Sequence, residues 1–538
     1  MKFLESEKLR RSSEDSDEQR LVYNERIARL RKSEYPMLKG ITYLDHGGTT
    51  LASKTLLTSF ARELQNTLLA NPHSDAANPS VSSIIVAETR SMVLEFCKAD
   101  PNLFDIVFVA NATAAVKLVM DCFAGIKGGF DYCYHLNSHT SLVGVRELAE
   151  KIHCLATNEQ TEDWLSGQYQ PFEACEGERP TLFAYPAQSN MNGQRLPLHW
   201  SRQLRQSNNH PRTFTLLDAA AFVSTTPFDL SDHETAPDFV ALSFYKIFGF
   251  PDLGALIVRK ASAHILESRK YFGGGTTEMI TCLEKQPWVA RKDTSLHARL
   301  EDGTVAIRSV LALRCAITSH RLLFISMHDI SQHTSWLSKM LHQRLCRLMH
   351  ENGIAVCHFY KAQSSTFGDA EAQGATITFN IRESNGSWTS PYAVGALLRQ
   401  RKIHVRTGSL CNPAGMAIAL ELSSADIRRA YAEGVRCNQQ DDVRTGGALF
   451  GMVRVTFGAM STIEDVEAFA SCIEHHFVDR NCSEGVPARS DDRRWRRDSK
   501  NVPLLREKHE KRPHVPPGPT CRRLRLFGIR RAFARCVG

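Results

Sequence analysis

The sequence lacks the signals of a secreted, membrane-spanning or metal-stapled protein. None of its segments approaches about 18 uninterrupted apolar residues, and the first twenty residues contain no apolar signal-peptide core. Its 15 cysteines form no CxxC pair and are not combined with histidines at zinc-finger spacing. Neither a disulfide framework nor a metal site is predicted, and these absences favour a cytoplasmic protein with reduced thiols.

Most of the chain also lacks excess charge. The whole sequence has a net charge of +8, but the 58 residues from Asn481 to Gly538 carry 16 Lys and Arg against 6 Asp and Glu, a net of +10. Residues 1–480 therefore have a net charge of −2, which argues against nucleic-acid binding by the body of the protein. With 42% hydrophobic and 23% charged residues, the composition excludes a wholly disordered chain, collagen and a coiled coil.

The basic tail, residues 481–538, has three interpretations. It is a disordered arm for anionic partners, nucleic acid included, or it contains an amphipathic basic helix (RRLRLFGIRRAF) for a membrane surface or a partner. The third interpretation is a truncated or mis-assembled chain end, because the composition changes abruptly just after a regular helix.

Alternating short strands and helices predict an α/β fold over residues 21–320. Six segments have the length and residue types of strands: FDIVFVA, YCYHL, RPTLFAY, TFTLLDAA, DFVALSF and GALIVRK. Such alternation predicts a mainly parallel sheet flanked by helices, with ligands at the carboxyl ends of the strands. We expect a smaller α+β domain over residues 321–480, a helix over 18–33, one long helix or a pair over 311–350, and a mobile polar leader over 1–20.

Two residues that close predicted strands indicate cofactor chemistry. Lys246 lies among aromatic and aliphatic residues in SFYKIFGF; burial there would lower the pKa of its amine, and only a neutral amine condenses with an aldehyde. Asp218 either caps the next helix or keeps a pyridine nitrogen protonated. The alternative for Lys246 is an exposed lysine at a strand end. The order of Asp218 and then Lys246, each after a strand, favours the cofactor interpretation.

Further candidates lie in turns after strands or in a polar loop. A helix that begins near Thr113 offers backbone N–H groups for a phosphate, although capping explains Thr113 equally well. His139 is either an ordinary core or surface histidine or stacks on an aromatic cofactor. Cys411 lies in a glycine-containing loop five residues after Arg406, which favours a reactive thiolate. Arg454 is either a clamp for a substrate carboxylate or a member of a surface ion pair.

Taken together, these residues resemble the fold-type I pyridoxal-phosphate enzymes, in the cysteine-desulfurase-like branch of the class V aminotransferase family. Within that branch the sequence is most similar to the sulfurase domain of the molybdenum cofactor sulfurases. The similar strings span about residues 41–475 in order and are YLDHGGTTL, NPHS, SNMNGQRLPL, LLDAAAFVST, SFYKIFGFPDLGALIVR, YFGGGT, LEDGTVAI, VRTGSLCNPAG and VRVTFGAMST. The resemblance implies a mainly parallel seven-stranded sheet and a smaller α+β domain to which the N-terminal segment contributes.

The resemblance also implies pyridoxal 5'-phosphate as cofactor and a role for each site residue. The cofactor residues would be Lys246 as the Schiff-base lysine, Asp218 at the ring nitrogen, His139 stacked on the ring, Asn190 at the ring hydroxyl, Thr113 and Ser243 at the phosphate, and Thr276 at the phosphate of a neighbouring subunit of a homodimer. The carboxylate of L-cysteine would be bound by Arg406 and Arg454, and its sulfur would be carried as a persulfide by Cys411.

The implied function is transfer of sulfur from L-cysteine to molybdenum cofactor, which activates xanthine dehydrogenase and aldehyde oxidase and leaves L-alanine. Ordinary cysteine desulfurases have His before the lysine and Gln three residues after the aspartate; Tyr245 and Ala221 stand here instead, as in the molybdenum cofactor branch. Full-length members continue into a domain that binds molybdenum cofactor, where this sequence has its basic tail. The alternatives are a general cysteine desulfurase or selenocysteine lyase, an aminotransferase, against which Cys411 argues, and a non-catalytic fragment that regulates a longer partner.

Overall fold

The computed structural model describes residues 2–73, 80–172, 179–207, 209–283, 285–436 and 449–479, with side chains described from residue 17 onward. The chain divides into two units, Met1–Arg480 and Asn481–Gly538. The division falls where the change in charge predicts the start of the basic tail, which itself lies outside the described residues.

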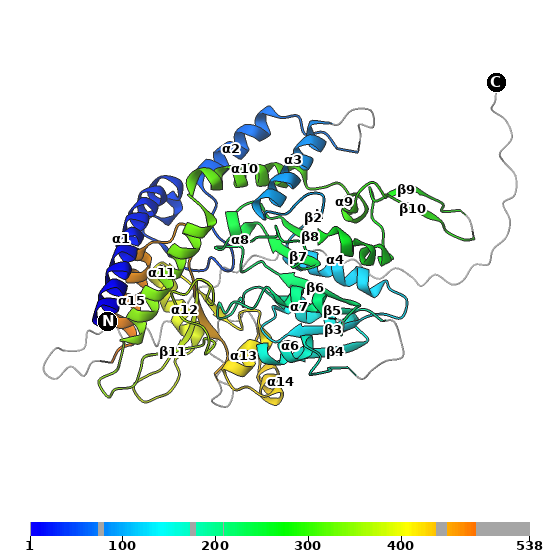
Figure 1. Cartoon of the computed structure of the whole chain (residues 1–538). Coiled ribbons are helices and arrows are strands. Elements are labelled where there is room, and N and C mark those ends of the chain that lie inside the picture. The colour runs from blue at the N-terminus through cyan, green and yellow to red at the C-terminus, as the bar shows by residue number, and fades with distance from the viewer. Residues whose placement is uncertain are drawn as a thin grey trace, which may run out of the picture. The chain divides into compact units, whose positions relative to one another are not determined.

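Seven strands form the central sheet of the first unit, in the order β2-β8-β7-β6-β5-β3-β4 (Figure 1). Their bounds are Phe104–Val109 for β2, Asp131–His135 for β3, Lys151–Leu155 for β4, Thr181–Pro186 for β5, Thr213–Asp218 for β6, Phe239–Ser243 for β7 and Gly254–Arg259 for β8. The strands from β7 to β4 pair in parallel, and β8 is antiparallel to both its neighbours. The predicted fold class is confirmed, with all six predicted strands. The seventh, β4, was missed because this partly buried edge strand mixes polar and apolar residues.

A second sheet forms the smaller domain, in the order β11-β12-β15-β14, with every pair antiparallel. Its strands are Cys357–Phe359 for β11, Thr376–Ile381 for β12, Arg406–Gly408 for β14 and Met452–Thr456 for β15. The N-terminal segment joins this domain, because β1 (Thr42–Tyr43) pairs in parallel with β13 (Ile403–His404). A two-stranded hairpin is formed by β9 (Thr277–Ile280) and β10 (Val289–Arg291).

Helices cover both faces of the large sheet. Successive residues of a strand point to opposite faces, so they pack into two separate cores. In β2, Ile106 belongs to the core that also contains residues of α3 and α10, whereas Val107 belongs to the core that contains residues of α4. The α-helices are α1 (Lys2–Glu34), α2 (Lys54–Asn66), α3 (Val81–Phe96), α4 (Ala112–Ala124), α5 (Thr140–Val143), α6 (Asn158–Leu165), α7 (Trp200–Gln206), α8 (Tyr245–Phe248), α9 (Leu296–Leu300), α10 (Ile307–Leu323), α11 (Met327–Cys346), α12 (Pro391–Gln400), α13 (Pro413–Ala419), α14 (Ser424–Ala432) and α15 (Ile463–Phe477).

Helices lie at both ends of the large domain, where the sequence made two predictions. The region 311–350 is a pair of helices, α10 and α11, rather than one long helix. Residues 2–20 belong to α1, and their Glu, Lys, Arg and Leu residues have good helix propensity; the mobility expected of this leader stays a prediction. Among the described residues, no single helix has the length and apolar character needed to cross a membrane.

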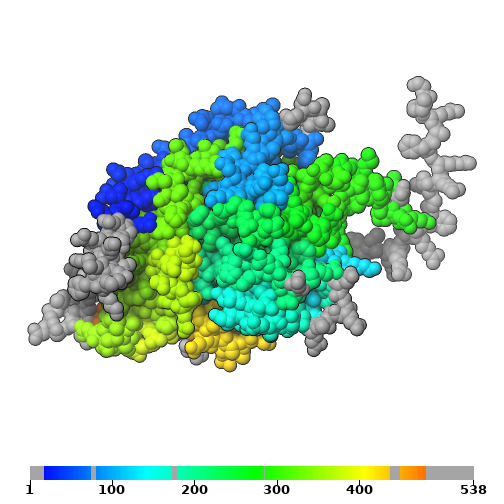
Figure 2. Space-filling view, viewed as in Figure 1, coloured from blue at the N-terminus to red at the C-terminus, as the bar shows by residue number. Residues whose placement is uncertain are grey.

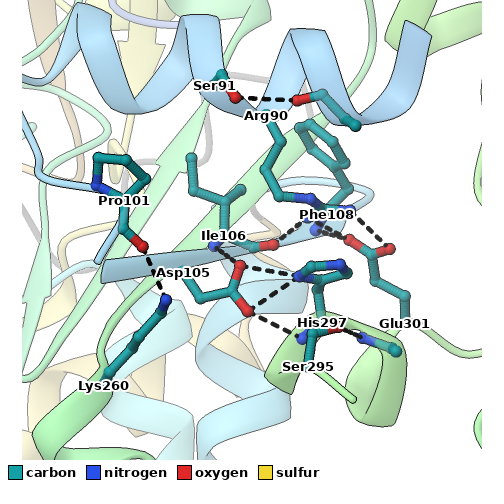
Figure 3. A network of polar contacts seen from close by, with 12 residues as sticks. Arg90, Ser91, Pro101, Asp105, Ile106, Phe108, Lys260, Ser295, His297 and Glu301 are labelled. Atoms are coloured by element: carbon teal, nitrogen blue, oxygen red, sulfur yellow. Dashed lines mark hydrogen bonds and ion pairs between the residues drawn. The ribbon is translucent and has the colours of Figure 1, made fainter. Parts of the chain in front are cut away.

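Strand β2 is an edge strand, so its outward-facing backbone groups have no neighbouring strand to bond. Arg90 of α3 donates to the carbonyl of Ile106. Glu301, just after α9, accepts from the N–H of Phe108 at 2.7 Å. The two side chains pair with each other at 2.9 and 3.1 Å (Figure 3). This buried ion pair thus replaces a strand partner for β2, whose carboxyl end leads into the turn that begins α4.

Glu301→Ala should destabilise the protein strongly. It leaves the Arg90 charge buried without a partner and the Phe108 N–H unsatisfied, a loss of about 3–5 kcal/mol in unfolding free energy. Urea unfolding followed by circular dichroism measures it. Glu467→Ala, which removes the exposed partner of Arg344, is the control and should cost about 1 kcal/mol or less. Equal losses in the two variants would contradict the role of the buried pair.

Candidate active site

The amino-terminal end of α4 lies beside the carboxyl end of β7, and two of its first-turn N–H groups are bonded to side chains. Asn111, not Thr113, is its N-cap, and its side chain accepts from the N–H of Ala114 at 3.0 Å. Ser243, at the carboxyl end of β7, accepts from the N–H of Ala112 at 2.9 Å. Thr113 is exposed. Its N–H, which lies between the bonded N–H groups of Ala112 and Ala114 in the first turn, has no hydrogen-bond partner in the described residues. Thr113 and Ser243 therefore lie together at a helix N-terminus, where a phosphate group binds favourably.

Lys246 lies in the single turn of α8, immediately after β7. The turn ends at Gly249, whose φ is 78°; a Cβ there would lie 2.2 Å from the backbone of Leu51, so only glycine fits. Burial lowers the pKa of the Lys246 amine, and Arg454 adds to this while Asp218 opposes it. The amine forms no hydrogen bond within the described residues, although some of the residue's surface is exposed. A buried, unpaired amine of this kind is suited to covalent chemistry.

Asp218 and His139 follow the carboxyl ends of β6 and β3, on the same side of the sheet as Lys246. Asp218 is buried, and its Oδ1 accepts from the N–H of Ala220 at 3.0 Å. His139 is the N-cap of α5, and its Nδ1 accepts from the N–H of Ser141 at 3.1 Å, so a proton on the neutral ring belongs on Nε2. Burial and the positive charges around it lower the pKa of His139.

Asn190 connects the large domain to the loop that carries Cys411. Its Nδ2 donates to the carbonyl of Leu410 at 2.7 Å, and its Oδ1 accepts from Nδ2 of Asn412 at 3.2 Å. One Nδ2 proton remains for a further acceptor, which is what the predicted bond to a cofactor hydroxyl requires. The N–H of Thr140 adds a bond to the carbonyl of Cys411 at 3.0 Å. Figure 2 shows the yellow segment of the chain lying against the cyan segment that contributes to the large sheet.

The Cys411 loop has an uncommon backbone conformation. Leu410 and Cys411 both have positive φ, 56° and 54°, a region that costs non-glycine residues of order 1 kcal/mol or more. The hydrogen bonds from the large domain and the buried Asn412, which caps α13, compensate for that cost. The thiol is partly buried, 3.9 Å from Nη2 of Arg406. The fold thus holds the thiol in a single, defined position beside a cation.

Arg454, in β15, is buried and lies directly opposite Arg406 of β14. Its Nη1 donates to the carbonyl of Asn190 at 2.8 Å and its Nη2 to Asp45 at 2.9 Å. Its Nε is buried without a hydrogen-bond partner in the described residues. An unsatisfied buried donor is costly, so this edge of the guanidinium is suited to an incoming carboxylate.

Thr276 forms no hydrogen bond with the other predicted site residues in the described part of the chain. It is fully buried, and its hydroxyl donates to the carbonyl of Gly273 at 2.8 Å. A contact with a neighbouring subunit requires that bond to be replaced, so the role of Thr276 stays a prediction.

Sequence reasoning missed three residues that organise the site: Asn111, Asn412 and Asp45. The first two cap helices, and Asn412 precedes a proline in CNPAG, a signal that could have identified it. Asp45 lies within YLDHGGTTL, but its pairing with a residue 409 positions away has no local signature.

The fold and this arrangement define the fold-type I class of pyridoxal-phosphate enzymes. The family model described as Aminotransferase class-V matches residues 42–469, so the chain belongs to the class V aminotransferase family, whose members use pyridoxal phosphate. The resemblance found in the sequence is thereby confirmed.

Curated relatives include molybdenum cofactor sulfurases. Those of Chaetomium globosum and Neurospora crassa are 47% identical over 484 residues and 50% identical over 462 residues. The alignments cover 89% and 85% of this chain, but 62% and 48% of those proteins. The chain thus spans only about half to three fifths of the length of these relatives.

Solved structures with the same fold include cysteine desulfurases. That of Thermococcus onnurineus has a TM-score of 0.63 and 20% identity, and covers 83% of this chain and 97% of its own. CsdA of Escherichia coli has a TM-score of 0.60 and 16% identity over 84% of this chain and 98% of its own. At this level of identity the likeness establishes the fold.

The lowered pKa of Lys246 should make stability depend on pH in the cofactor-free protein. Between the folded and unfolded pKa values the unfolded chain binds more protons, so stability rises with pH. Lys246→Met should therefore be more stable than the wild type at neutral pH, with the difference closing as the pH approaches 10.5, the ordinary pKa of lysine. Chemical unfolding over this pH range measures it, and Lys127→Met, at an exposed position, controls for a lost surface charge. A difference that stays constant with pH would contradict the assignment.

Proposed function

We propose that this chain takes sulfur from L-cysteine with pyridoxal phosphate as cofactor and carries it as a persulfide on Cys411. As the sulfurase part of a molybdenum cofactor sulfurase, it would pass that sulfur to molybdenum cofactor. The observation that carries the proposal is the meeting of an amine, a thiol and a carboxylate-binding arginine in one site. Cys411 and Arg454 lie close enough to Lys246 for their charges to affect its pKa. A simple aminotransferase has no use for the thiol.

The residues present fit the cofactor. Thr113 and Ser243 would hold the phosphate at the amino-terminal end of α4, and Asp218 would keep the ring nitrogen protonated. Lys246 would bind the cofactor covalently. His139 would stack on the cofactor ring, and Asn190 would form a hydrogen bond with the ring hydroxyl. When bound, pyridoxal phosphate supplies an electron-withdrawing ring that accepts the electrons released at Cα of an amino acid.

The protein residues then have separate tasks. Arg454, assisted by Arg406, binds the substrate carboxylate, and the amine of Lys246, favoured in its neutral form by burial, takes the proton from Cα. The Cys411 thiolate attacks the sulfur of the substrate. A bond forms between the two sulfur atoms as the carbon–sulfur bond of the substrate breaks. The electron pair of the broken bond passes to Cβ, which takes up one proton, equivalent to the proton lost when the Cys411 thiol became a thiolate, and the product is L-alanine.

Delivery of the sulfur to molybdenum cofactor is the part of the proposal that rests on the relatives rather than on the residues of this site. The relatives that suggest molybdenum cofactor as acceptor are longer than this chain, so activation of xanthine dehydrogenase and aldehyde oxidase would involve a portion that the aligned residues do not include. A general cysteine desulfurase or selenocysteine lyase would use the same residues. Incubation with L-cysteine, and then with molybdenum cofactor or a small thiol as acceptor, separates these possibilities. A homodimer with Thr276 at the neighbouring site, in the cytoplasm, belongs to the same proposal.

Lys246→Ala should abolish the visible absorbance that a covalently bound pyridoxal cofactor gives the protein, because no other buried amine replaces it in the site. Absorbance spectra of the purified variant and of wild type, both after incubation with the cofactor, measure the effect. Lys127→Ala is the control and should keep the wild-type spectrum. An unchanged spectrum in Lys246→Ala would reject the assignment.

Cys411→Ala should retain the cofactor spectrum and lose persulfide formation, because the thiol is needed only as the sulfur acceptor. A persulfide-specific label after incubation with L-cysteine measures the loss, and alanine analysis follows the product. Cys346→Ala, which removes an exposed thiol on α11, is the control. Wild-type persulfide levels in Cys411→Ala would refute the role of that residue.

A further inference from the structure

Two arginines face each other across an antiparallel strand pair at the substrate end of the site. Arg406 of β14 and Arg454 of β15 are direct register partners, and like charges in such a position repel. A buried guanidinium also needs a counter-charge to offset the loss of water. The carboxylate that contacts the pair within the described residues is that of Asp45, 2.9 Å from Nη2 of Arg454.

The backbone around Asp45 is fixed on both sides. Leu44 and His46 are buried, and Asp45 forms an isolated β-bridge with Thr456, two residues beyond Arg454. The carboxylate therefore approaches the arginine from a rigid segment that the small domain holds in place.

The Gly47–Gly48 turn closes over this ion pair. A Cβ on Gly48 would lie 2.9 Å from Oδ2 of Asp45, and one on Gly47 would lie 3.0 Å from Cγ2 of Thr456 and 3.4 Å from Nη2 of Arg454. Neither glycine has positive φ, so the turn needs them for space rather than for conformation. The sequence DHGG thus makes room for a carboxylate and a guanidinium to meet beneath the backbone.

We propose that Asp45 is the positioning residue for substrate binding: it fixes the guanidinium of Arg454 and sets the charge of the site so that it accepts a ligand with a single carboxylate. This inference rests on the proposed function, because it concerns the same amino-acid site. Asp45 acts through Arg454 and does not touch the reacting atoms.

The positioning follows from the hydrogen bonds of Arg454. Asp45 holds Nη2 and the carbonyl of Asn190 holds Nη1, so the planar group is fixed at two points. Nε is left as the unsatisfied donor. A substrate carboxylate therefore meets an oriented donor edge and loses less entropy on binding than it would with a mobile arginine.

The charge selection follows from counting. Within the cluster of three residues, Arg406 and Arg454 contribute two positive charges and Asp45 one negative charge, which leaves a net charge of +1 beside the proposed carboxylate position; Lys246 and Asp218 would be engaged by the cofactor and are not part of this cluster. A second acidic group on the ligand would be unbalanced and would lie in the field of Asp45, which like-charge repulsion disfavours. An α-amino acid with an uncharged or thiol side chain satisfies the balance, whereas a dicarboxylic amino acid does not.

Two substitutions separate these effects in the cofactor-loaded protein. Asp45→Asn keeps an oxygen that accepts from Nη2 but removes the charge, and Asp45→Ala removes both. Asp229→Asn is the matched control, because Asp229 pairs with Lys98 at 2.8 Å on the surface. The measurements are KM and kcat for L-cysteine, and dissociation constants for L-alanine and L-aspartate by calorimetry.

Asp45→Ala should raise the KM for L-cysteine about tenfold, equivalent to about 1.4 kcal/mol, with kcat changing much less, since the binding of the carboxylate is lost uniformly. Asp45→Asn should keep a KM near that of wild type. It should lower the ratio of the dissociation constant of L-aspartate to that of L-alanine by about tenfold. If the ion pair of Asp45 only stabilised the fold, neither substitution would raise KM without lowering kcat, and neither would alter the preference for L-alanine over L-aspartate.

The outcomes separate the two proposals. If wild type binds neither L-cysteine nor L-alanine, the proposed function fails. If wild type binds both, and both Asp45 variants have wild-type KM values and wild-type preference, the inference about Asp45 is overturned while the proposed function stands. Unfolding measured for the cofactor-free variants shows whether a raised KM merely reflects lost folding, and a fall in kcat equal to the rise in KM would also overturn the inference.

Discussion

The guanidinium of Arg454 is the interaction on which the site depends, because it joins three parts of the chain. It belongs to β15 of the small domain, bonds the carbonyl of Asn190 from the large domain, and pairs with Asp45 from the N-terminal segment. Arginine suits this task because its planar group offers several donors in fixed directions. The same group that fastens the domains together has an Nε donor without a partner in the described residues, so under the proposed function folding and binding would use one side chain.

The site keeps its polar groups out of water and leaves several of them incompletely paired. The amine of Lys246 forms no hydrogen bond within the described residues, Nε of Arg454 is an unsatisfied buried donor, and two residues of the Cys411 loop have left-handed backbones. Each of these features costs folding free energy. They are concentrated where β3, β5, β6 and β7 end, while the cores on both faces of the sheet are apolar. The apolar cores of the domain supply enough stability to offset this local cost in folding free energy. Such a cost is expected at a site where residues are selected for their chemistry rather than for packing.

The proposed persulfide chemistry adds a demand for rigidity. A thiol that attacks a bound substrate must be held within a short distance and in the right direction. The loop is held by Asn190, Thr140 and Asn412, so its position depends on the large domain, from which the residues proposed to bind the cofactor also come. This shared support would couple the position of Cys411 to that of the residues proposed to bind the ring.

The sequence by itself determined the class of fold, six of the seven strands of the large sheet and the residues that close strands, because periodicity, strand ends and motif order are local properties. Lys246, Asp218 and His139 were singled out because each closes or follows a strand, and the carboxyl ends of parallel strands meet at one edge; Ser243 was implied only by the family resemblance. The tertiary structure alone decided that Arg406 faces Arg454, that Asn190 holds the Cys411 loop, that Thr276 is buried and that Asp45 balances the arginines. The contacts of Asn190 with Leu410 and of Asp45 with Arg454 join residues more than 200 positions apart, and Arg406 and Arg454 are 48 positions apart on neighbouring strands, so only the tertiary packing brings these groups together.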